Sequence, residues 1–421
     1  MKEKLKDLVR AIWRSSAYRG ILLGLDRLAY VTAKRAKSEQ PYTLLLAPPT
    51  GENIGDQAMF DSAIHNTRGN VVAVTMSTTY RLPVGEDEAR TRVIVLAGHI
   101  HRPPLVRFGV VRRFGGLVKG AQALIAPGAD TVDGGHTHGS LARLSLLRLG
   151  ALEGIPTILQ GFSWKADAPT TVRKVVADLA RRGVQVSPRD PVSNRRLQAS
   201  GVEPTTQVAD LAFCYPKREE LPADLARHVE QLAGDDRPVV LLNTSGLINR
   251  RHDLVADYGA VVNELHERGA RIIFTPHVDR SWDDDFAMAR KVHAAFGNGE
   301  DYVVEQLLSP AQVRNLATYA NLVVTGRMHL AILSLSQTTP VICLATHGKV
   351  EGLFEFFELP DLVVEPRPGC GEQLVGRVAH ALDHADEIRT QLDSRLPGVV
   401  EFSRQNFALL ESDQSTAVRP A

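Results

Sequence analysis

Short apolar runs alternate with longer amphipathic stretches along most of this chain. In the first half, runs rich in β-branched and aliphatic residues predict strands at 42–49, 70–76, 92–98, 123–128, 155–161 and 183–188. The segments between them, such as "GDQAMFDSAIHNT" and "SLARLSLLRLGALEG", have the apolar spacing of amphipathic helices. The alternation predicts an α/β fold in which helices cover a parallel sheet.

The second half repeats this pattern after a polar segment. Its predicted strands are 238–245, 270–277, 302–307, 321–326 and 340–345. Segment 215–237 contains Pro and Gly and is the predicted linker between two doubly wound domains, 41–214 and 238–370. Ligands of such sheets bind at the carboxyl ends of the strands. Residues 371–421 are predicted to form helices, with a return to the first domain as one alternative.

The N-terminal segment is basic and has an amphipathic pattern. Residues 1–37 contain ten Lys or Arg against three acids, and Leu5, Leu8, Ile12 and Trp13 fall near helical spacing. We therefore expect an amphipathic helical extension over 1–40. Two alternatives remain open for it: a helix lying on an anionic membrane surface, or a helix packed on the body of the protein or on a partner.

The composition narrows the class of protein. The 421 residues are 44% hydrophobic and 23% charged, with a formal net charge of +1, which does not favour a nucleic-acid binder. The longest apolar runs fall short of a membrane span, and the N-terminus lacks a secretory signal pattern. Cys214, Cys343 and Cys370 are far apart, which argues against a disulfide framework or a structural zinc site. We expect a cytoplasmic protein, with peripheral contact at the inner membrane face as the alternative left open by residues 1–37.

A Gly-containing loop connects the first predicted strand to a helix. It reads "PPTGENIGDQAMFDSAI" over 48–64. Gly51 and Gly55 would let the backbone approach a ligand closely, and the helix N-terminus favours an anion. Asp56 is either a ligand contact or a simple helix cap.

A second strand-to-helix loop reads "APGADTVDGGHTHGS" over 126–140. Asp133, His136 and His138 add titratable groups to it. The arrangement favours a loop that binds substrate hydroxyls over a metal site, because the segment offers no further nearby ligand.

Three further strand ends carry cations. In "VSPRDPVSNRRL" (186–197), Arg189 either clamps a phosphate or carboxylate or pairs locally with Asp190 as the helix cap. In "TGRMHLAIL" (325–333), Arg327 and His329 are either site residues or a surface Arg and a buried His at a helix start. In "CLATHGKVEGLFE" (343–355), Lys349 follows a strand and is either a phosphate-directed cation or a solvated loop residue. Together the three cations are predicted to point into one anion-binding cleft.

These blocks, in this order, resemble the polysaccharide pyruvyl transferase family. The matching pieces span about residues 43–360 and are "NIGDQA" (53–58), "DGGHTHG", "PRDPVSNRRL" followed by "GVEPTTQVADLAF" (201–213), "GRMHLAI" (326–332) and the "GK" at 348–349. The resemblance implies a GT-B-like fold: two Rossmann-like domains facing a cleft, with an acceptor side in the first domain and a donor side in the second.

The resemblance also implies a reaction and its residues. Phosphoenolpyruvate would donate its three-carbon unit to two hydroxyls of a saccharide or lipid-linked saccharide, forming a pyruvate ketal in cell-surface or exopolysaccharide biosynthesis. The implied donor-binding residues are Arg189, Arg327, Met328 and Lys349. The implied catalytic residues are His329 and Arg327, and the acceptor-binding residues are Asn53, Asp56, Asp133 and His136. No cofactor, metal or nucleic-acid partner is expected.

Two other functions remain open. One is a nucleotide-sugar-dependent glycosyltransferase of the same GT-B architecture, for which "LNTSGLINRRHD" (242–253) is the candidate diphosphate loop. The other is a non-catalytic relative that binds saccharides or anions. The three predicted cations at strand ends argue against the second of these.

Overall fold

The chain forms two compact units in the computed structural model, which describes residues 2–83, 85–232, 234–345 and 348–412. Unit 1 contains Met1–Thr50, Met59–Cys214 and Phe402–Ala421, and unit 2 contains Gly51–Ala58 and Tyr215–Glu401. Two segments differ from the predicted domain bounds. The sequence predicts that segment 51–58 lies in the first domain and that segment 215–237 is a linker, but both belong to unit 2. The predicted terminal segments include Met1 and 413–421, which lie outside the described residues.

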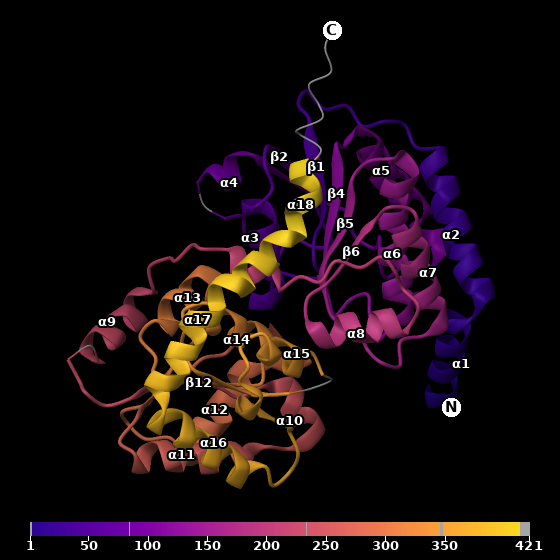
Figure 1. Ribbon diagram of the computed structural model, residues 1–421. Coiled ribbons are helices and arrows are strands. Elements are labelled where there is room, and N and C mark those ends of the chain that lie inside the picture. The colour runs from indigo at the N-terminus through magenta and orange to yellow at the C-terminus, as the bar shows by residue number, and fades with distance from the viewer. Residues whose placement is uncertain (1, 84, 233, 346–347, 413–421) are drawn as a thin grey trace. The chain divides into compact units, whose positions relative to one another are not determined.

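Unit 1 is built on a parallel six-stranded sheet (Figure 1). Its strand order is β3-β2-β1-β4-β5-β6, so the order reverses between β1 and β4. The strands are β1 Tyr42–Leu46, β2 Asn70–Thr75, β3 Thr91–Val95, β4 Ala123–Ala129, β5 Thr157–Phe162 and β6 Gln185–Pro188. A doubly wound sheet with this order opens a crevice at the carboxyl ends of the strands where the order reverses.

Unit 2 repeats the same topology. Its sheet has the order β11-β8-β7-β12-β13-β14, again with parallel pairs throughout. The strands are β7 Val239–Asn243, β8 Arg271–Phe274, β11 Tyr302–Val303, β12 Leu322–Thr325, β13 Val341–Leu344 and β14 Val363–Val364. The two sheets confirm the predicted α/β fold. The pattern did not predict β14 or the hairpin of β9 (Asp279–Arg280) and β10 (Asp283–Asp284), because these two-residue strands lie outside the longer apolar runs.

Helices cover both sheets. Unit 1 contains α1 Lys2–Arg14, α2 Ser16–Val31, α4 Glu86–Ala89, α5 Pro104–Gly120, α6 Thr137–Glu153, α7 Thr170–Arg181, α8 Pro191–Ala199 and α18 Ala408–Ser412. Unit 2 contains α9 Ala223–Leu232, α10 Gly246–His252, α11 Val255–Glu267, α12 Asp285–Phe296, α13 Pro310–Ala317, α14 Met328–Leu335, α15 Lys349–Glu355 and α16 Gly371–Asp383. Helices α3 (Ile54–His65) and α17 (Ala385–Arg404) each have residues in both units.

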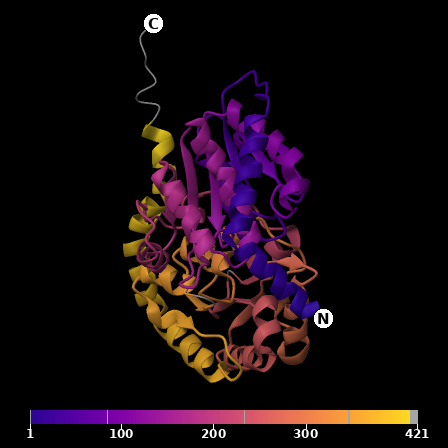
Figure 2. The same cartoon turned by 90° about the vertical axis from the view of Figure 1, so that its right-hand side faces the viewer.

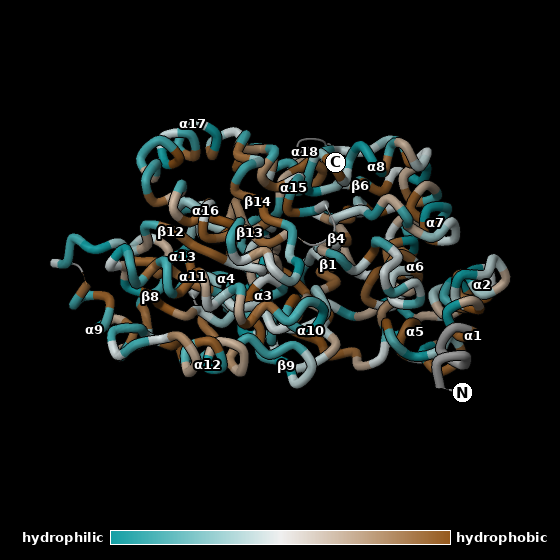
Figure 3. The backbone as a smooth tube through the Cα atoms, turned by 90° about the horizontal axis from the view of Figure 1, so that it is seen from below, coloured by the Kyte–Doolittle hydropathy of each residue, from teal (hydrophilic) through white to brown (hydrophobic). Residues whose placement is uncertain are grey.

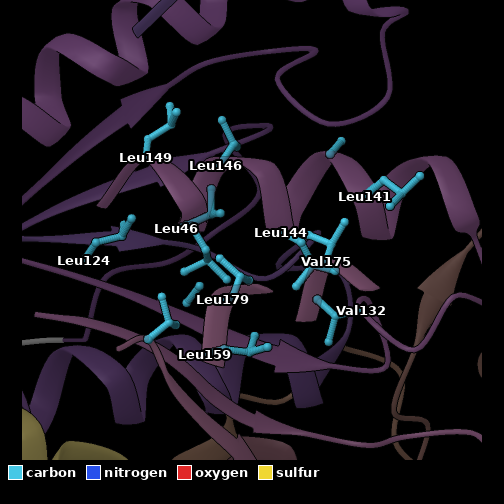
Figure 4. Close-up of a cluster of buried hydrophobic side chains, with 14 of the residues drawn as sticks. Leu46, Leu124, Val132, Leu141, Leu144, Leu146, Leu149, Leu159, Val175 and Leu179 are labelled. Carbon is cyan, nitrogen blue, oxygen red and sulfur yellow. The ribbon is translucent and has the colours of Figure 1, made fainter. Parts of the chain in front are cut away.

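A close-packed aliphatic core joins the unit 1 sheet to its helices (Figure 4). Leu124 and Leu159 from the strands meet Leu144 of α6 and Leu179 of α7, and all four are fully buried. Each such side chain contributes about 1.5–3 kcal/mol through burial. The interior strands of unit 2 are apolar as well: Figure 3 colours hydrophobic residues brown, and strands such as β12 have this colour. The continuous apolar runs of these strands follow from burial on both faces of a parallel sheet.

The C-terminal end of the chain packs on unit 1. Ser403 Oγ donates to the carbonyl oxygen of Asp210 at 2.7 Å, and Gln160 Nε2 donates to the carbonyl of Asn406 at 3.1 Å. Ser403 and Asn406 are both fully buried. The last described turns therefore cover part of the unit 1 core.

The N-terminal helices pack on the outer side of α5 and α6 (Figures 1 and 2). Asp26 of α2 accepts a hydrogen bond from Arg107 of α5 at 2.9 Å, with both side chains buried. Lys119 Nζ donates to the carbonyl of Ala33 at 2.8 Å. Helix α2 is thus part of the fold of unit 1. Among the described residues, no helix combines the length and apolar character needed to cross a membrane.

Removing the acid of the buried pair should destabilise unit 1 strongly. Asp26→Ala leaves the Arg107 guanidinium buried without its counter-charge, and we expect a loss of about 3–5 kcal/mol in the free energy of unfolding. Urea denaturation followed by circular dichroism measures it. The control is Asp178→Ala, whose side chain is 30% exposed and pairs with both Arg182 and Arg148 near the surface. That change should cost about 1 kcal/mol or less, and equal losses would contradict the assignment.

Candidate active site

Arg327 lies where β12 ends and α14 begins. It is the residue before Met328, the first residue of α14. Its guanidinium faces two buried carboxylates: Nε donates to Asp285 Oδ2 at 3.1 Å, and Nη1 donates to Asp283 Oδ2 at 3.0 Å. Nη2 donates to both acids, at 2.5 Å to Asp285 Oδ1. The planar fork is therefore fixed in one orientation.

The carboxylate of Asp285 connects its own segment by hydrogen bonds to three others. It accepts hydrogen bonds from Asn243 Nδ2 and from the backbone N–H of Gly246, both at 2.9 Å, and from the backbone N–H of His277 at 3.1 Å. These partners follow β7 and β8, while Arg327 follows β12. The fully buried carboxylate thus holds three strand ends at the carboxyl edge of the unit 2 sheet.

Arg327 keeps its charge in this setting. Burial opposes the charged form, but the carboxylates of Asp285 and Asp283 outweigh it and raise the pKa of the Arg327 guanidinium. A guanidinium has five N–H donors. The bonds to the two acids use four of them, which leaves one Nη1 hydrogen for another acceptor.

Gly55 makes room for the imidazole of His329. A Cβ at Gly55 would lie 2.2 Å from Nδ1 and 2.5 Å from Cγ of His329, far inside van der Waals contact. Gly55 is the second residue of α3. The "NIGD" segment therefore packs directly on the "GRMH" segment, although 272 residues separate Gly55 from Arg327.

His277 is a second imidazole beside His329. It is buried, and burial, with the neighbouring His329 and Arg327, lowers the pKa of His277 well below its usual range, so its ring is neutral. Its carbonyl oxygen accepts from the backbone N–H of Ile54 at 3.3 Å. His277 therefore joins the 53–56 segment to the Asp285 network.

The predicted acceptor residues Asn53 and Asp56 lie in this same cluster. Asn53 Oδ1 accepts from the backbone N–H of Gly55 at 2.9 Å, and its backbone pairs with Val278 in an isolated antiparallel bridge. Asp56 Oδ2 accepts from Arg280 at 3.3 Å. Both residues pack within unit 2, whereas the sequence prediction assigns them to the first domain.

Met328 and Lys349 each occupy the first position of a unit 2 helix. Met328 begins α14, and its side chain is buried. Lys349 begins α15, follows Gly348 in the left-handed region with φ 80°, and is partly buried. Both therefore belong to the same unit as Arg327.

Arg189 lies after β6 in unit 1 and is buried with three partners. Its nitrogens donate to Ser163 Oγ at 2.8 Å, to Asp210 at 2.8 Å and to Asp130 at 2.7 Å. Burial disfavours the charge, but Asp130 and Asp210 raise the pKa of the guanidinium above its usual value. These partners follow β4 and β5 or belong to the "VADLAF" motif, so the cluster marks the carboxyl edge of the sheet.

Asp190 does not pair with Arg189. Its carboxylate caps α8, accepting from the backbone N–H and from Oγ of Ser193, each at 2.6 Å. The alternative that Arg189 pairs with Asp190 is therefore wrong, because the guanidinium pairs with Asp130 and Asp210 instead.

The 133–138 loop has its own contacts in unit 1. Asp133 pairs with Lys165 at 2.9 Å and accepts from the backbone N–H of Gly135, while His136 is exposed at the start of α6. His138 is buried, and its Nδ1 lies 2.5 Å from the hydroxyl of Tyr18. Among the described residues, no group of three or more His, Cys, Asp or Glu is arranged to hold a metal ion.

The predicted site residues thus divide between the two units. Arg189, Asp133 and His136 belong to unit 1, and Asn53, Asp56, Arg327, Met328, His329 and Lys349 belong to unit 2. Sequence reasoning missed Asp283, Asp285 and His277. His277 ends the predicted strand 270–277, so the rule that selected Arg327 would have selected it too.

Solved structures share this fold at low identity. A UDP-GlcNAc 2-epimerase from Neisseria meningitidis bound to UDP-GlcNAc matches with TM-score 0.55 and 10% identity, over 88% of this chain and 100% of the other. A sucrose-phosphate synthase from Thermosynechococcus elongatus matches with TM-score 0.53 and 14% identity, over 90% and 100%. A glycosyltransferase from Rickettsia africae matches with TM-score 0.53 and 10% identity, over 88% and 99%. These likenesses show a GT-B-like fold.

Sequence comparison identifies the family. No curated protein matches the chain. The family model described as polysaccharide pyruvyl transferase matches residues 32–348, which include the Arg189 cluster and the Asp285–Arg327 network. The chain therefore belongs to the polysaccharide pyruvyl transferase family.

Proposed function

We propose that this protein transfers a pyruvyl group from phosphoenolpyruvate to two hydroxyls of a saccharide. The observation that carries the proposal is the Arg327–Met328–His329 junction at the carboxyl edge of the unit 2 sheet, inside the span that matches the family. The junction combines a fixed guanidinium, a helix N-terminus and an imidazole, which suits an anionic substrate that must exchange protons.

The chemistry requires proton transfers at carbon and at oxygen. Two C–O bonds form between the central carbon of phosphoenolpyruvate and the acceptor oxygens, and the C–O bond to phosphate breaks. One hydroxyl proton converts the methylene to a methyl group, and the other leaves with phosphate. The product is a cyclic ketal that carries a carboxylate. An imidazole exchanges protons near neutral pH, so His329 is the proposed acid–base group.

Arg327 is the proposed donor clamp of unit 2. Asp283 and Asp285 hold its fork, and one Nη1 hydrogen is left to bind a phosphate or carboxylate oxygen. A donor group fixed before substrate arrives costs no reorganisation during the reaction. Lys349 and the Met328 N–H are proposed to add positive charge and a hydrogen bond to the same anion.

Arg189 is the proposed donor residue of unit 1. Its bonds to Ser163, Asp210 and Asp130 use three of its five N–H donors. The guanidinium is buried, whereas the side chain of Asp130 is 45% exposed. We therefore propose that Asp130 moves aside when Arg189 engages the donor.

The acceptor is proposed to be a saccharide or lipid-linked saccharide that meets Asn53, Asp56, Asp133 and His136. Asp133 and Asp56 are already paired with Lys165 and Arg280, so each is held in place to accept from a sugar hydroxyl. We propose that the enzyme works in the cytoplasm, peripherally at the inner face of the membrane, and supplies cell-surface or exopolysaccharide synthesis.

The donor assay separates pyruvyl transfer from sugar transfer. We expect saccharide-dependent release of phosphate from phosphoenolpyruvate, and no nucleotide release from UDP- or GDP-sugars. A phosphate assay and a nucleoside diphosphate assay on the same acceptor extracts measure both. Saccharide-dependent nucleotide release would instead favour a glycosyltransferase, and release from neither donor would favour a non-catalytic binding relative.

Replacing the proposed acid–base group should remove turnover and preserve the fold. We expect His329→Ala to lower kcat by about 10²–10⁴-fold, the usual contribution of general acid–base catalysis. Single-turnover phosphate release and thermal melting, measured side by side, separate chemistry from folding. Full activity in a folded His329→Ala protein would refute the role.

Gly55 offers a more selective change. In Gly55→Ala the new Cβ would clash with the His329 ring, 2.2 Å from Nδ1, so the imidazole must move. Alanine favours a helix over glycine by about 1 kcal/mol. The new Cβ would also lie 2.9 Å from His329 Cβ, so rotation of the ring alone does not relieve the clash. We therefore expect at least about a tenfold loss of kcat, since small misplacements cost up to about 10²-fold, and a lower melting temperature that the helix preference of alanine only partly offsets. Gly376→Ala in α16, where a Cβ meets nothing within 4 Å, is the matched control and should keep full activity.

A further inference from the structure

The outer face of α2 is apolar although it faces solvent. Ile21, Leu28 and Val31 lie on it, together with the small residues Ala17, Gly20 and Gly24, and all are exposed. The opposite face packs on unit 1 through Leu22, Asp26 and Ala29. A surface helix of a globular protein normally presents polar residues to water. Helix α2 is therefore apolar on two sides, and the described residues cover one of them.

The neighbouring helices also carry exposed apolar side chains. Leu8 and Ile12 of α1 and Leu105 and Val106 of α5 are also exposed, and α2 packs against both helices. Seven large apolar side chains of these three helices are 48–77% exposed: Leu8, Ile12, Ile21, Leu28, Val31, Leu105 and Val106. We call them the N-terminal apolar surface. Clustered exposed apolar residues mark an interaction site more strongly than scattered ones.

The charged residues of the segments that carry the N-terminal apolar surface are mostly basic. Residues 8–37 contain seven Arg or Lys and one acid, Asp26, which is buried against Arg107. The segment 96–120 contains no acid at all, and its Arg112 and Arg113 are exposed. An exposed surface that is apolar and basic complements an anionic bilayer, where side chains insert and cations meet lipid phosphates.

The surface is joined to the proposed acceptor loop. Trp13 of α1 stacks on the ring of His138 with centroids 5.3 Å apart, and the Tyr18 hydroxyl of α2 contacts His138 Nδ1 at 2.5 Å. His138 is two residues after His136. Because His138 lies in the first turn of α6 and is buried, α1, α2 and this loop pack together in unit 1.

We propose that the N-terminal apolar surface binds anionic membrane directly, through α1, α2 and the start of α5 together. The sequence suggested membrane contact through residues 1–37 as one alternative; the structure adds α5 and retains α2 as a packed part of unit 1. This inference stands on the surface alone. If the proposed pyruvyl transfer is also correct, the contact with His138 holds the acceptor loop near the membrane, which suits a lipid-linked saccharide.

Sedimentation of the full chain with vesicles tests the proposal. We expect binding to vesicles of phosphatidylcholine mixed with phosphatidylglycerol, and weak binding to phosphatidylcholine alone. Ile21→Ser combined with Leu28→Ser should lower the anionic-vesicle affinity by about tenfold or more, because two inserting side chains are lost. Leu105→Ser combined with Val106→Ser should lower it similarly, which tests the α5 contribution. All four positions are exposed, so folding is unaffected.

Tyr319→Ser is the control, because Tyr319 is exposed to a similar degree, 44%, but belongs to unit 2. It should leave vesicle binding unchanged. Wild-type protein that stays in the supernatant with anionic vesicles would overturn the proposal, and so would variants that bind as well as wild type. If sedimentation velocity instead showed a dimer that the Ile21→Ser and Leu28→Ser changes dissociate, the surface would be a protein interface. Vesicle binding is read without turnover, so failure of pyruvyl transfer would be seen separately.

Discussion

The buried carboxylate of Asp285 is the constraint on which the unit 2 site depends. It accepts from the end of β7, from the segment after β8 and from Arg327 after β12, so three strand ends converge on one acid. Removing a partner from such a network leaves an uncompensated buried charge, which costs far more than the net contribution of the intact network. The same bonds orient Arg327 and bring His277 against the 53–56 segment, where Gly55 admits the His329 ring.

The fold was largely readable from the sequence because buried parallel strands appear as continuous apolar runs. The carboxyl-end rule then selected Arg189, Arg327 and His329 without knowledge of their neighbours. It did not find Asp283 and Asp285, because in "DDD" before a helix they look like cap residues, and one of that run, Asp284, does cap α12. Nor does a sequence record that Gly55 touches His329, since that distance depends on how the loop after β1 packs on unit 2.

Arg189 in unit 1 and Arg327 in unit 2 have the same kind of surroundings, each within its own unit. Arg189 is bonded to Asp130 and Asp210, and Arg327 to Asp283 and Asp285, so neither is a solvated cation at a strand end. Each cluster carries one more negative than positive formal charge. An anion bound at either cluster would therefore gain less from net charge than from the fixed N–H groups that remain.

The loop 133–138, which we propose to bind the acceptor, ends at His138, whose ring contacts Trp13 of α1 and Tyr18 of α2. Those helices are held by the Asp26–Arg107 pair, yet they present apolar side chains outward. An exposed apolar face adds nothing to the stability of an isolated protein and raises its tendency to aggregate. Its presence on helices that contact this loop therefore favours a partner that covers it during function. A membrane that also carries the proposed acceptor would cover this apolar face and bring the acceptor close to the loop.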